Sequence, residues 1–224
     1  MSFVNLPTLL VSGDGRVFTP GAQTEVYPGP LLSPMYERSI TEAGIEKILK
    51  LADDAALLRP APDYTLPADG PQVTDAPDTV VMINVNGKAF EHRAYALGMF
   101  GGDGSGSEQT PARENLFRFV TLLADVAKVA GAANVGKDEV WLPDRFRFQA
   151  TVVDPTQWTD PAPTVVEWPT GSGVVLADSA QCAVVGADAM KGLFDTATQL
   201  TFFQEEALVY QLAVVGVLPG AAVC

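Results

Sequence analysis

Apolar, β-forming residues gather in two stretches, each centred on a polar turn signal. The first covers residues 8–19 around Gly13-Asp14-Gly15, and the second covers residues 79–97 around Asn86-Gly87. Asn-Gly is favoured in a two-residue type I′ turn because both central residues must adopt positive φ. Val, Ile and Thr are frequent on both sides of these turns, as expected for strands. We therefore predict a β-hairpin in each stretch.

A helical period, with apolar residues three or four positions apart, occurs three times. It covers residues 41–57, 111–130 and 188–197. Thr41 and Thr110 stand where an N-cap hydroxyl is preferred, and proline follows Thr110 at the first helical position. We predict a helix in each of these three segments.

The remaining strands and loops set the expected fold class. Residues 35–40, 145–153, 182–185, 200–203 and 207–218 have strand composition, and residues 60–77, 98–109 and 154–173 have loop composition. Hairpins mixed with helices, without regular strand–helix alternation, are typical of α+β proteins. We expect an antiparallel sheet built from hairpins, with three helices packed against it. Residues 1–224 form either a single domain or two loosely repeated halves, about 1–135 and 136–224.

Charge narrows the classes of partner. The chain has 14 Lys and Arg against 27 Asp and Glu, a net charge of −13. Nucleic-acid binders need a basic surface, so we expect no nucleic-acid partner. No stretch reaches the ~20 apolar residues that span a bilayer, so we expect no membrane span.

The two cysteines allow two interpretations. Cys182 and Cys224 form no CxxC motif, and His92 is the one histidine, so the usual His/Cys zinc sites are not expected. The cysteines are either two separate thiols or one disulfide, and the disulfide is the hypothesis we favour because Cys224 ends the chain. It would close a loop of 224 − 182 + 1 = 43 residues, worth roughly 4 kcal/mol in the chain-entropy account. A disulfide indicates an oxidising compartment.

No motif identifies a reaction. On the strand expected over residues 88–97, His92 shares a face with Phe90 and Ala94, while Glu91, Arg93 and Tyr95 share the other face. No serine lies in a nucleophile-elbow motif. We expect no catalytic residue, no metal site and no cofactor. Carboxylate pairs such as Asp53-Asp54 are numerous, so carboxylate-dependent glycoside hydrolysis stays open as an alternative.

Aromatic residues in the long loops are the candidate contacts. Tyr64, Trp158 and Trp168 lie in proline-rich segments, where exposed rings can contact a partner or ligand. The competing interpretation is that these rings anchor the loops to the core. The segment from Asp103 to Glu108 lacks the ligand spacing of a calcium loop.

Several short stretches together resemble a family of uncharacterised actinobacterial extracytoplasmic proteins, of secreted or lipoprotein type. The similar stretches are LLVSGDGRV (9–17), YPGPLL (27–32), ITEAGI (40–45), TVVMINVNG (79–87), GADA (186–189), YQLAV (210–214), Leu218-Pro219 and the terminal cysteine. The resemblance implies an exported bacterial protein, tethered by a lipid anchor in its full-length form. It implies no catalytic residues.

Three functions follow as hypotheses. The first is a non-enzymatic extracytoplasmic domain that binds or scaffolds a protein or glycan at the cell envelope. The second is a carboxylate-dependent hydrolase of envelope glycan or peptide. The third is a surface or filament-forming subunit that self-assembles.

Overall fold

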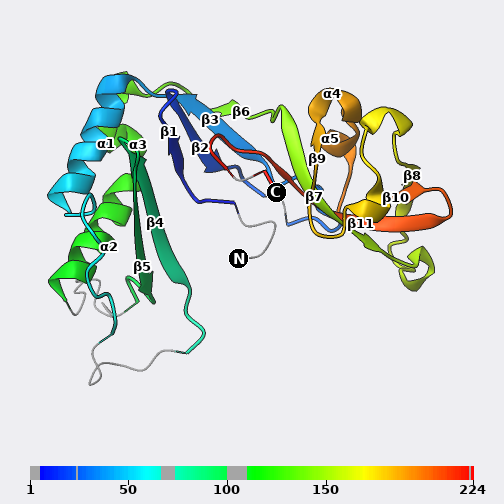
Figure 1. Ribbon diagram of the computed structural model, residues 1–224, viewed down its shortest axis with the longest axis horizontal. Helices are drawn as coiled ribbons and strands as arrows, with labels where there is room; N and C mark the ends of the chain where they lie inside the picture. The colour runs from blue at the N-terminus through cyan, green and yellow to red at the C-terminus, as the bar shows by residue number, and fades with distance from the viewer. Residues whose placement is uncertain (1–5, 24, 67–73, 100–109, 222) are drawn as a thin grey trace. The chain divides into compact units, whose positions relative to one another are not determined.

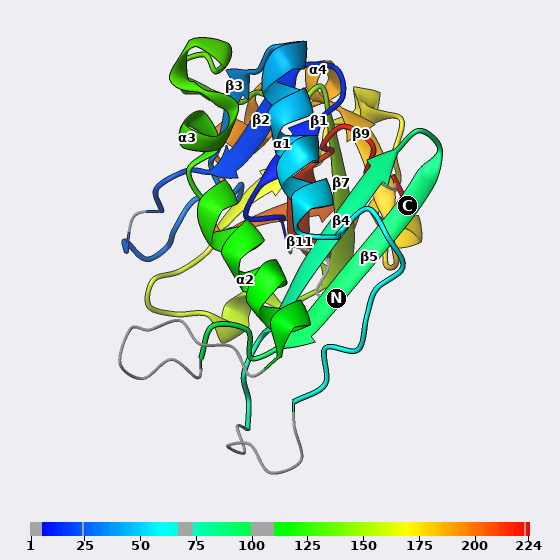
Figure 2. The same cartoon turned by 90° about the vertical axis from the view of Figure 1, so that its left-hand side faces the viewer.

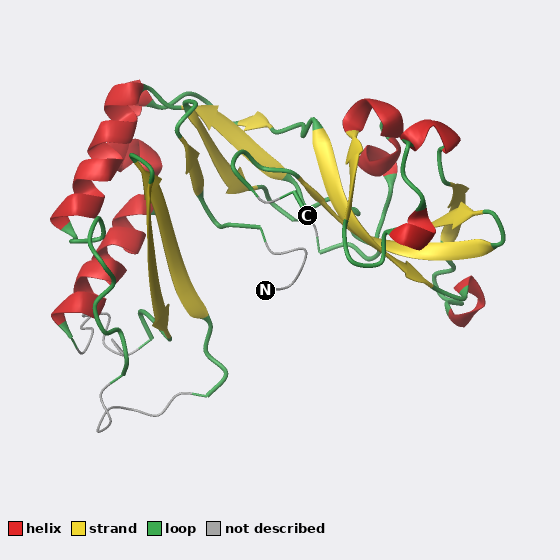
Figure 3. Ribbon diagram, viewed as in Figure 1, coloured by secondary structure: helices red, strands yellow, loops and turns green. Residues whose placement is uncertain are grey.

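The computed structural model describes residues 6–23, 25–66, 74–99, 110–221 and 223–224 (Figure 1). The chain divides into two compact units. Unit 1 is Met1–Arg38 with Asp138–Cys224, and unit 2 is Ser39–Lys137. Helices and mainly antiparallel sheets confirm the α+β class (Figure 3). The choice between one domain and two repeated halves stays a prediction.

The smaller sheet of unit 1 begins with the first predicted hairpin. Its strands lie in the order β1 (Leu10–Ser12), β2 (Arg16–Pro20), β3 (Met35–Ser39) and β6 (Glu139–Val140). Antiparallel pairing of Val11 with Val17 places the Gly-Asp-Gly segment at the turn, as predicted. Phe18, Met35 and Leu218 form the buried cluster beside this sheet.

The larger sheet of unit 1 has five strands. Their order is β8 (Thr164–Glu167), β10 (Thr201–Glu205), β11 (Leu208–Gly216), β7 (Arg145–Val152) and β9 (Ala183–Gly186). Alternating residues of β7 and β11 bury one face against two short helices, α4 (Ala187–Met190) and α5 (Leu193–Thr196). The core residues of this face include Phe146, Phe148, Trp168, Phe194 and Phe203.

Two expectations for unit 1 are wrong. Residues 164–167, expected as loop, form β8, because their backbone groups pair in parallel with those of β10. The single helix expected over residues 188–197 is broken, because Lys191 and Gly192 adopt left-handed φ values of 48° and 75°. That backbone conformation cannot continue a right-handed helix.

In its described residues, unit 2 combines one hairpin with three α-helices, which Figure 2 shows from the front. Its elements are α1 (Glu42–Asp54), β4 (Asp78–Val85), β5 (Lys88–Tyr95), α2 (Pro111–Leu123) and α3 (Val126–Ala130). The second predicted hairpin is confirmed, and Asn86 and Gly87 have the positive φ values of its turn, 51° and 71°. The hydroxyls of Thr41 and Thr110 accept hydrogen bonds from the backbone N–H groups of Gly44 and Arg113, as N-caps do.

The helix expected over residues 111–130 is also divided. Asp125 accepts a hydrogen bond from the Lys128 N–H at 3.0 Å and so caps a new helix, α3. Together with the break at Lys191, this gives five α-helices in the described residues instead of the three expected. Four 3-10 turns complete the elements: η1 (Ala132–Asn134), η2 (Pro155–Gln157), η3 (Thr170–Ser172) and η4 (Leu176–Asp178).

The predicted disulfide is present. Cys182 and Cys224 are bonded, with their Cα atoms 5.6 Å apart, so the end of the chain is joined to the residue before β9. No helix among the described residues is long and apolar enough to cross a membrane.

Candidate functional site

The one histidine of the chain is a buried structural residue in unit 2. His92 on β5 has no exposed surface. Its Nε2 lies 2.8 Å from the backbone oxygen of Leu57, which can only accept, so Nε2 carries the proton. The Tyr64 hydroxyl lies 2.8 Å from Nδ1 and donates to it. Both ring nitrogens are therefore occupied, and the histidine joins β5 to the segment that follows α1.

A buried arginine closes the same network. Arg113, in the first turn of α2, has no exposed surface. Its guanidinium donates to the backbone oxygens of Tyr64, Tyr95 and Ala96 at 2.9, 3.1 and 3.3 Å. Charged donors make stronger hydrogen bonds than neutral ones. Arg113 thus holds residue 64 beside the end of β5, while the Tyr64 side chain reaches inward to His92.

A hollow of about 650 Å³ lies next to this network, within unit 2. One wall is residues 61–66, and the other is Glu91, Arg93 and Tyr95 of β5 with Asp78 of β4. Figures 1 and 2 both show the segment after α1 running beside β5. Because His92 and Arg113 both form hydrogen bonds with Tyr64, the loop wall is held in place.

Three charged side chains of the hollow form ion pairs. Arg93 contacts Asp78 at 3.0 Å and Glu91 at 3.3 Å. The hydrogen bond that Arg93 donates to Asp78, and then the one it donates to Glu91, raise the pKa of Arg93, so the guanidinium stays charged. On the loop wall, hydrogen bonds from Thr65 lower the pKa of Asp63. The hollow thus presents fixed carboxylate and guanidinium groups to solvent.

The three aromatic candidates lie in separate places. Tyr64 is 7% exposed and Trp168 is 5% exposed, so the expectation that their rings are offered on the surface is wrong for both. The Trp168 Nε1–H donates to the Val174 oxygen at 2.8 Å, and its ring packs against Phe203, so Trp168 anchors its loop to the core. Trp158 is half-buried, edge-on to Phe202 at 5.1 Å. A partner contact at these residues stays a prediction.

The structure describes only part of two of the expected binding loops. Residues 67–73 of the segment 60–77, and residues 100–109 of the segment 98–109, lie outside the described residues. The described part of the first loop, residues 61–66, lines the hollow.

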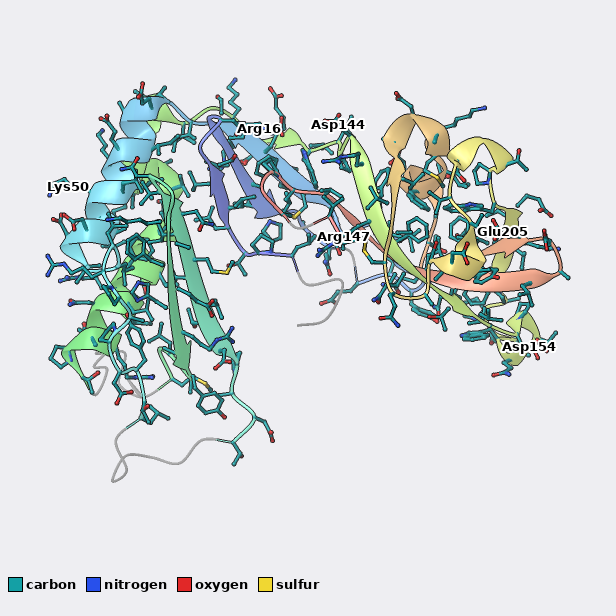
Figure 4. All side chains as sticks on the ribbon, viewed as in Figure 1. Arg16, Lys50, Asp144, Arg147, Asp154 and Glu205 are labelled. Atoms are coloured by element: carbon teal, nitrogen blue, oxygen red, sulfur yellow. A yellow bond between two sulfur atoms is a disulfide. The ribbon has the colours of Figure 1, made fainter. Side chains whose placement is uncertain are left out.

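Unit 1 offers weaker candidates. A second hollow of about 220 Å³ has a mainly apolar lining, in which Ser33 and Asp195 are the polar side chains. Arg16, labelled in Figure 4, contacts Asp14 at 2.6 Å and Glu37 at 3.8 Å and lies over the Phe18 ring. This cluster lies in neither hollow.

The carboxylate pair on α1 belongs to a solvated helix face. Asp54 pairs with Lys50, labelled in Figure 4, at 2.9 Å, and both side chains are more than half exposed. Such i,i+4 pairs stabilise a helix slightly.

Sequence reasoning missed the role of Arg113. A signal was present, because residue 113 falls three positions before Leu116 and so continues the apolar stripe of α2. A charged residue on that stripe needs buried partners, and backbone oxygens supply them here. By contrast, the pattern of β5 correctly placed Glu91, Arg93 and Tyr95 on one face, and these residues line the hollow.

No group of three or more His, Cys, Asp or Glu side chains within the described ranges is arranged to hold a metal ion. Comparison of the chain with protein-family models, with curated proteins and with solved structures found no match.

Proposed function

We propose that the chain is an extracytoplasmic, non-enzymatic domain that binds a protein or glycan of the cell envelope through the hollow of unit 2. The observation that carries this proposal is the construction of the hollow, whose loop wall is fixed by Tyr64, His92 and Arg113. Binding sites are typically concave, of ~300–1,000 Å³, and largely formed before the ligand arrives. The Cys182–Cys224 bond supports the compartment, because disulfides persist in oxidising environments.

The histidine geometry also favours binding. A general base must reach the proton that it removes, whereas His92 is buried and uses both nitrogens within the fold. The exposed groups of the hollow are an arginine and carboxylates, which recognise polar ligands by hydrogen bonds.

The test is ligand mapping on the whole protein. Soluble envelope glycan fragments and short peptides are titrated into ¹⁵N-labelled protein, and the amide signals of Asp63, Glu91 and Arg93 are followed. We expect shifts at these residues, and we expect Arg93→Ala, which alters the charge of the lining, to change the affinity at least fivefold. Arg16→Ala is the matched control, since Arg16 is also an exposed arginine between two carboxylates. Equal effects of the two variants would refute the assignment.

A carboxylate-dependent hydrolase is the second candidate, because Asp78 and Glu91 line the same hollow. It requires both carboxylates, one as acid and one as base or nucleophile. Release of reducing ends from glycan, or of new amino termini from peptide, would be lost in both Asp78→Asn and Glu91→Gln. Activity that persists in both variants, or no release by the wild type, would contradict this candidate.

A further inference from the structure

The backbone of β5 has an open edge. Beyond the last pair of the hairpin, the Ala96 N–H donates to the Pro77 oxygen at 3.0 Å. In an antiparallel pair, hydrogen-bonded positions recur every second residue. Ala94 and His92 therefore direct their N–H and C=O groups toward β4. Those of Glu91 and Arg93 point the opposite way, away from the hairpin.

The outward groups of Glu91 and Arg93 have no backbone partner within the described ranges. Among the described residues, no backbone hydrogen bond joins Glu91 or Arg93 to a segment other than β4. The loop wall of the hollow meets this edge at Tyr95, because Arg113 donates both to the Tyr64 oxygen of that wall and to the Tyr95 oxygen, which points away from β4.

An extended chain fits the space beside this edge. A row of unpaired N–H and C=O groups is a template for an added strand. From residue 91 to residue 93 the outward backbone groups span roughly 7 Å, at about 3.3 Å per residue. The volume of about 650 Å³ lies inside the usual range for ligand sites, ~300–1,000 Å³. The loop wall would then hold the far side of the added strand.

The charge of the hollow's lining indicates which side chains a bound segment carries. Asp63, Asp78 and Glu91 line the hollow against Arg93, which gives 1 − 3 = −2 for the lining. Arg93 is already paired with two of these carboxylates. The whole chain carries −13, which attracts cationic ligands over a distance. Pro62 and Leu66 add apolar surface on the loop wall.

We propose that the hollow binds an extended, lysine- or arginine-bearing peptide segment, which adds as a third strand to the free edge of β5. This inference rests on the proposed binding function and names its partner as protein. The basic side chain lies next to Glu91 and Asp63. Main-chain hydrogen bonds to Glu91 and Arg93 provide the affinity, as in other complexes formed by strand addition.

The probe is the peptide acetyl-Thr-Lys-Val-Lys-Val-Thr-amide, with a Glu-for-Lys version and two versions N-methylated on alternate residues. Binding is measured by fluorescence anisotropy, and amide hydrogen exchange is followed by NMR. We expect the Lys peptide to slow exchange at Glu91 and Arg93. The Glu version should bind at least tenfold more weakly, and only one of the two N-methylated versions should lose binding.

Two proline variants separate backbone pairing from charge. Glu91→Pro removes an outward N–H and should weaken binding at least tenfold, whereas Glu91→Ala, which keeps that N–H, should weaken it about threefold. Asn84→Pro is the control, because the Asn84 N–H also points outward but on the β4 edge. Proline is tolerated at such edge positions, and circular dichroism checks the fold of each variant.

The outcomes distinguish the two proposals. Equal weakening by Glu91→Pro and Glu91→Ala, or peptide binding without exchange protection at Glu91 and Arg93, would overturn strand addition. Glycan-induced shifts at the hollow without peptide binding would overturn the peptide and leave the proposed function standing. If neither the glycan nor the peptide shifts the amide NMR signals of the hollow residues, both proposals are wrong.

Discussion

The hydroxyl of Tyr64 is the most informative single group to remove. Tyr64→Phe deletes the donor to His92 Nδ1, 2.8 Å away, and conserves the ring that lies edge-on to the imidazole. No large cavity forms, because only one oxygen atom is lost. The buried Nδ1 is then left without a donor, since His92 has no contact with solvent.

The expected loss of stability is about 1–3 kcal/mol, the cost of an unsatisfied buried polar group. With a urea m-value of about 1–3 kcal/mol/M, a loss of 2 kcal/mol lowers the midpoint by roughly 0.7–2 M. Two probes locate the effect. All three tryptophans lie in unit 1, whereas α1, α2 and α3 lie in unit 2. Far-UV circular dichroism should therefore report the shift more strongly than tryptophan fluorescence does.

The control is Tyr27→Phe, because Tyr27 is 64% exposed and should change stability by less than about 0.5 kcal/mol. In a His92→Leu background, Tyr64→Phe should cost less than it does in the wild type, because the pair has already been broken. A midpoint for Tyr64→Phe equal to that of Tyr27→Phe would refute the reasoning. So would equal costs of Tyr64→Phe in the two backgrounds.

Three further outcomes are expected. Burial raises the pKa of Tyr64 above its ordinary 10.0. The stability that the protonated phenol contributes is therefore complete below pH 10 and is lost as the pH rises through the raised value. Urea denaturation between pH 9 and 11 should show that Tyr64→Phe loses less stability over this range than the wild type does. Reducing the Cys182–Cys224 bond should cost about 4 kcal/mol in denaturation with and without reductant, and thiol titration of the unreduced, denatured chain should find no free sulfhydryl. Trp168→Ala should cost about 3–5 kcal/mol and half-buried Trp158→Ala clearly less, an order that urea denaturation followed by circular dichroism would check.

Local sequence signals were sufficient to predict both hairpins and the starts of the two longer helices, α1 and α2. Asn86-Gly87 and Gly13-Asp14-Gly15 determined their turns because positive φ is a property of single residues. Thr41 and Thr110 determined where α1 and α2 begin, through hydroxyls that cap nearby N–H groups. These features depend on a few neighbouring residues, so sequence is sufficient for them.

Breaks inside predicted helices were harder to see. Asp125 competes as an N-cap within an otherwise continuous apolar pattern, and Lys191 takes a left-handed conformation that few non-glycine residues adopt. The sequence did not predict the strand β8 for a different reason. Its partner β10 lies more than thirty residues later, and that parallel pairing is a non-local contact.

By itself, then, the sequence predicted the α+β class, both hairpins and the shared face of Glu91, Arg93 and Tyr95, and it favoured the Cys182–Cys224 disulfide over two separate thiols. Only the tertiary structure decided that Tyr64 and Trp168 are buried and that Arg113 serves backbone oxygens. It also decided that residues 61–66 form the second wall of a hollow beside β5. The physical reason is the range of the interactions. Turn, cap and alternation preferences act between near neighbours, whereas burial and the pairing of buried polar groups depend on segments tens of residues apart.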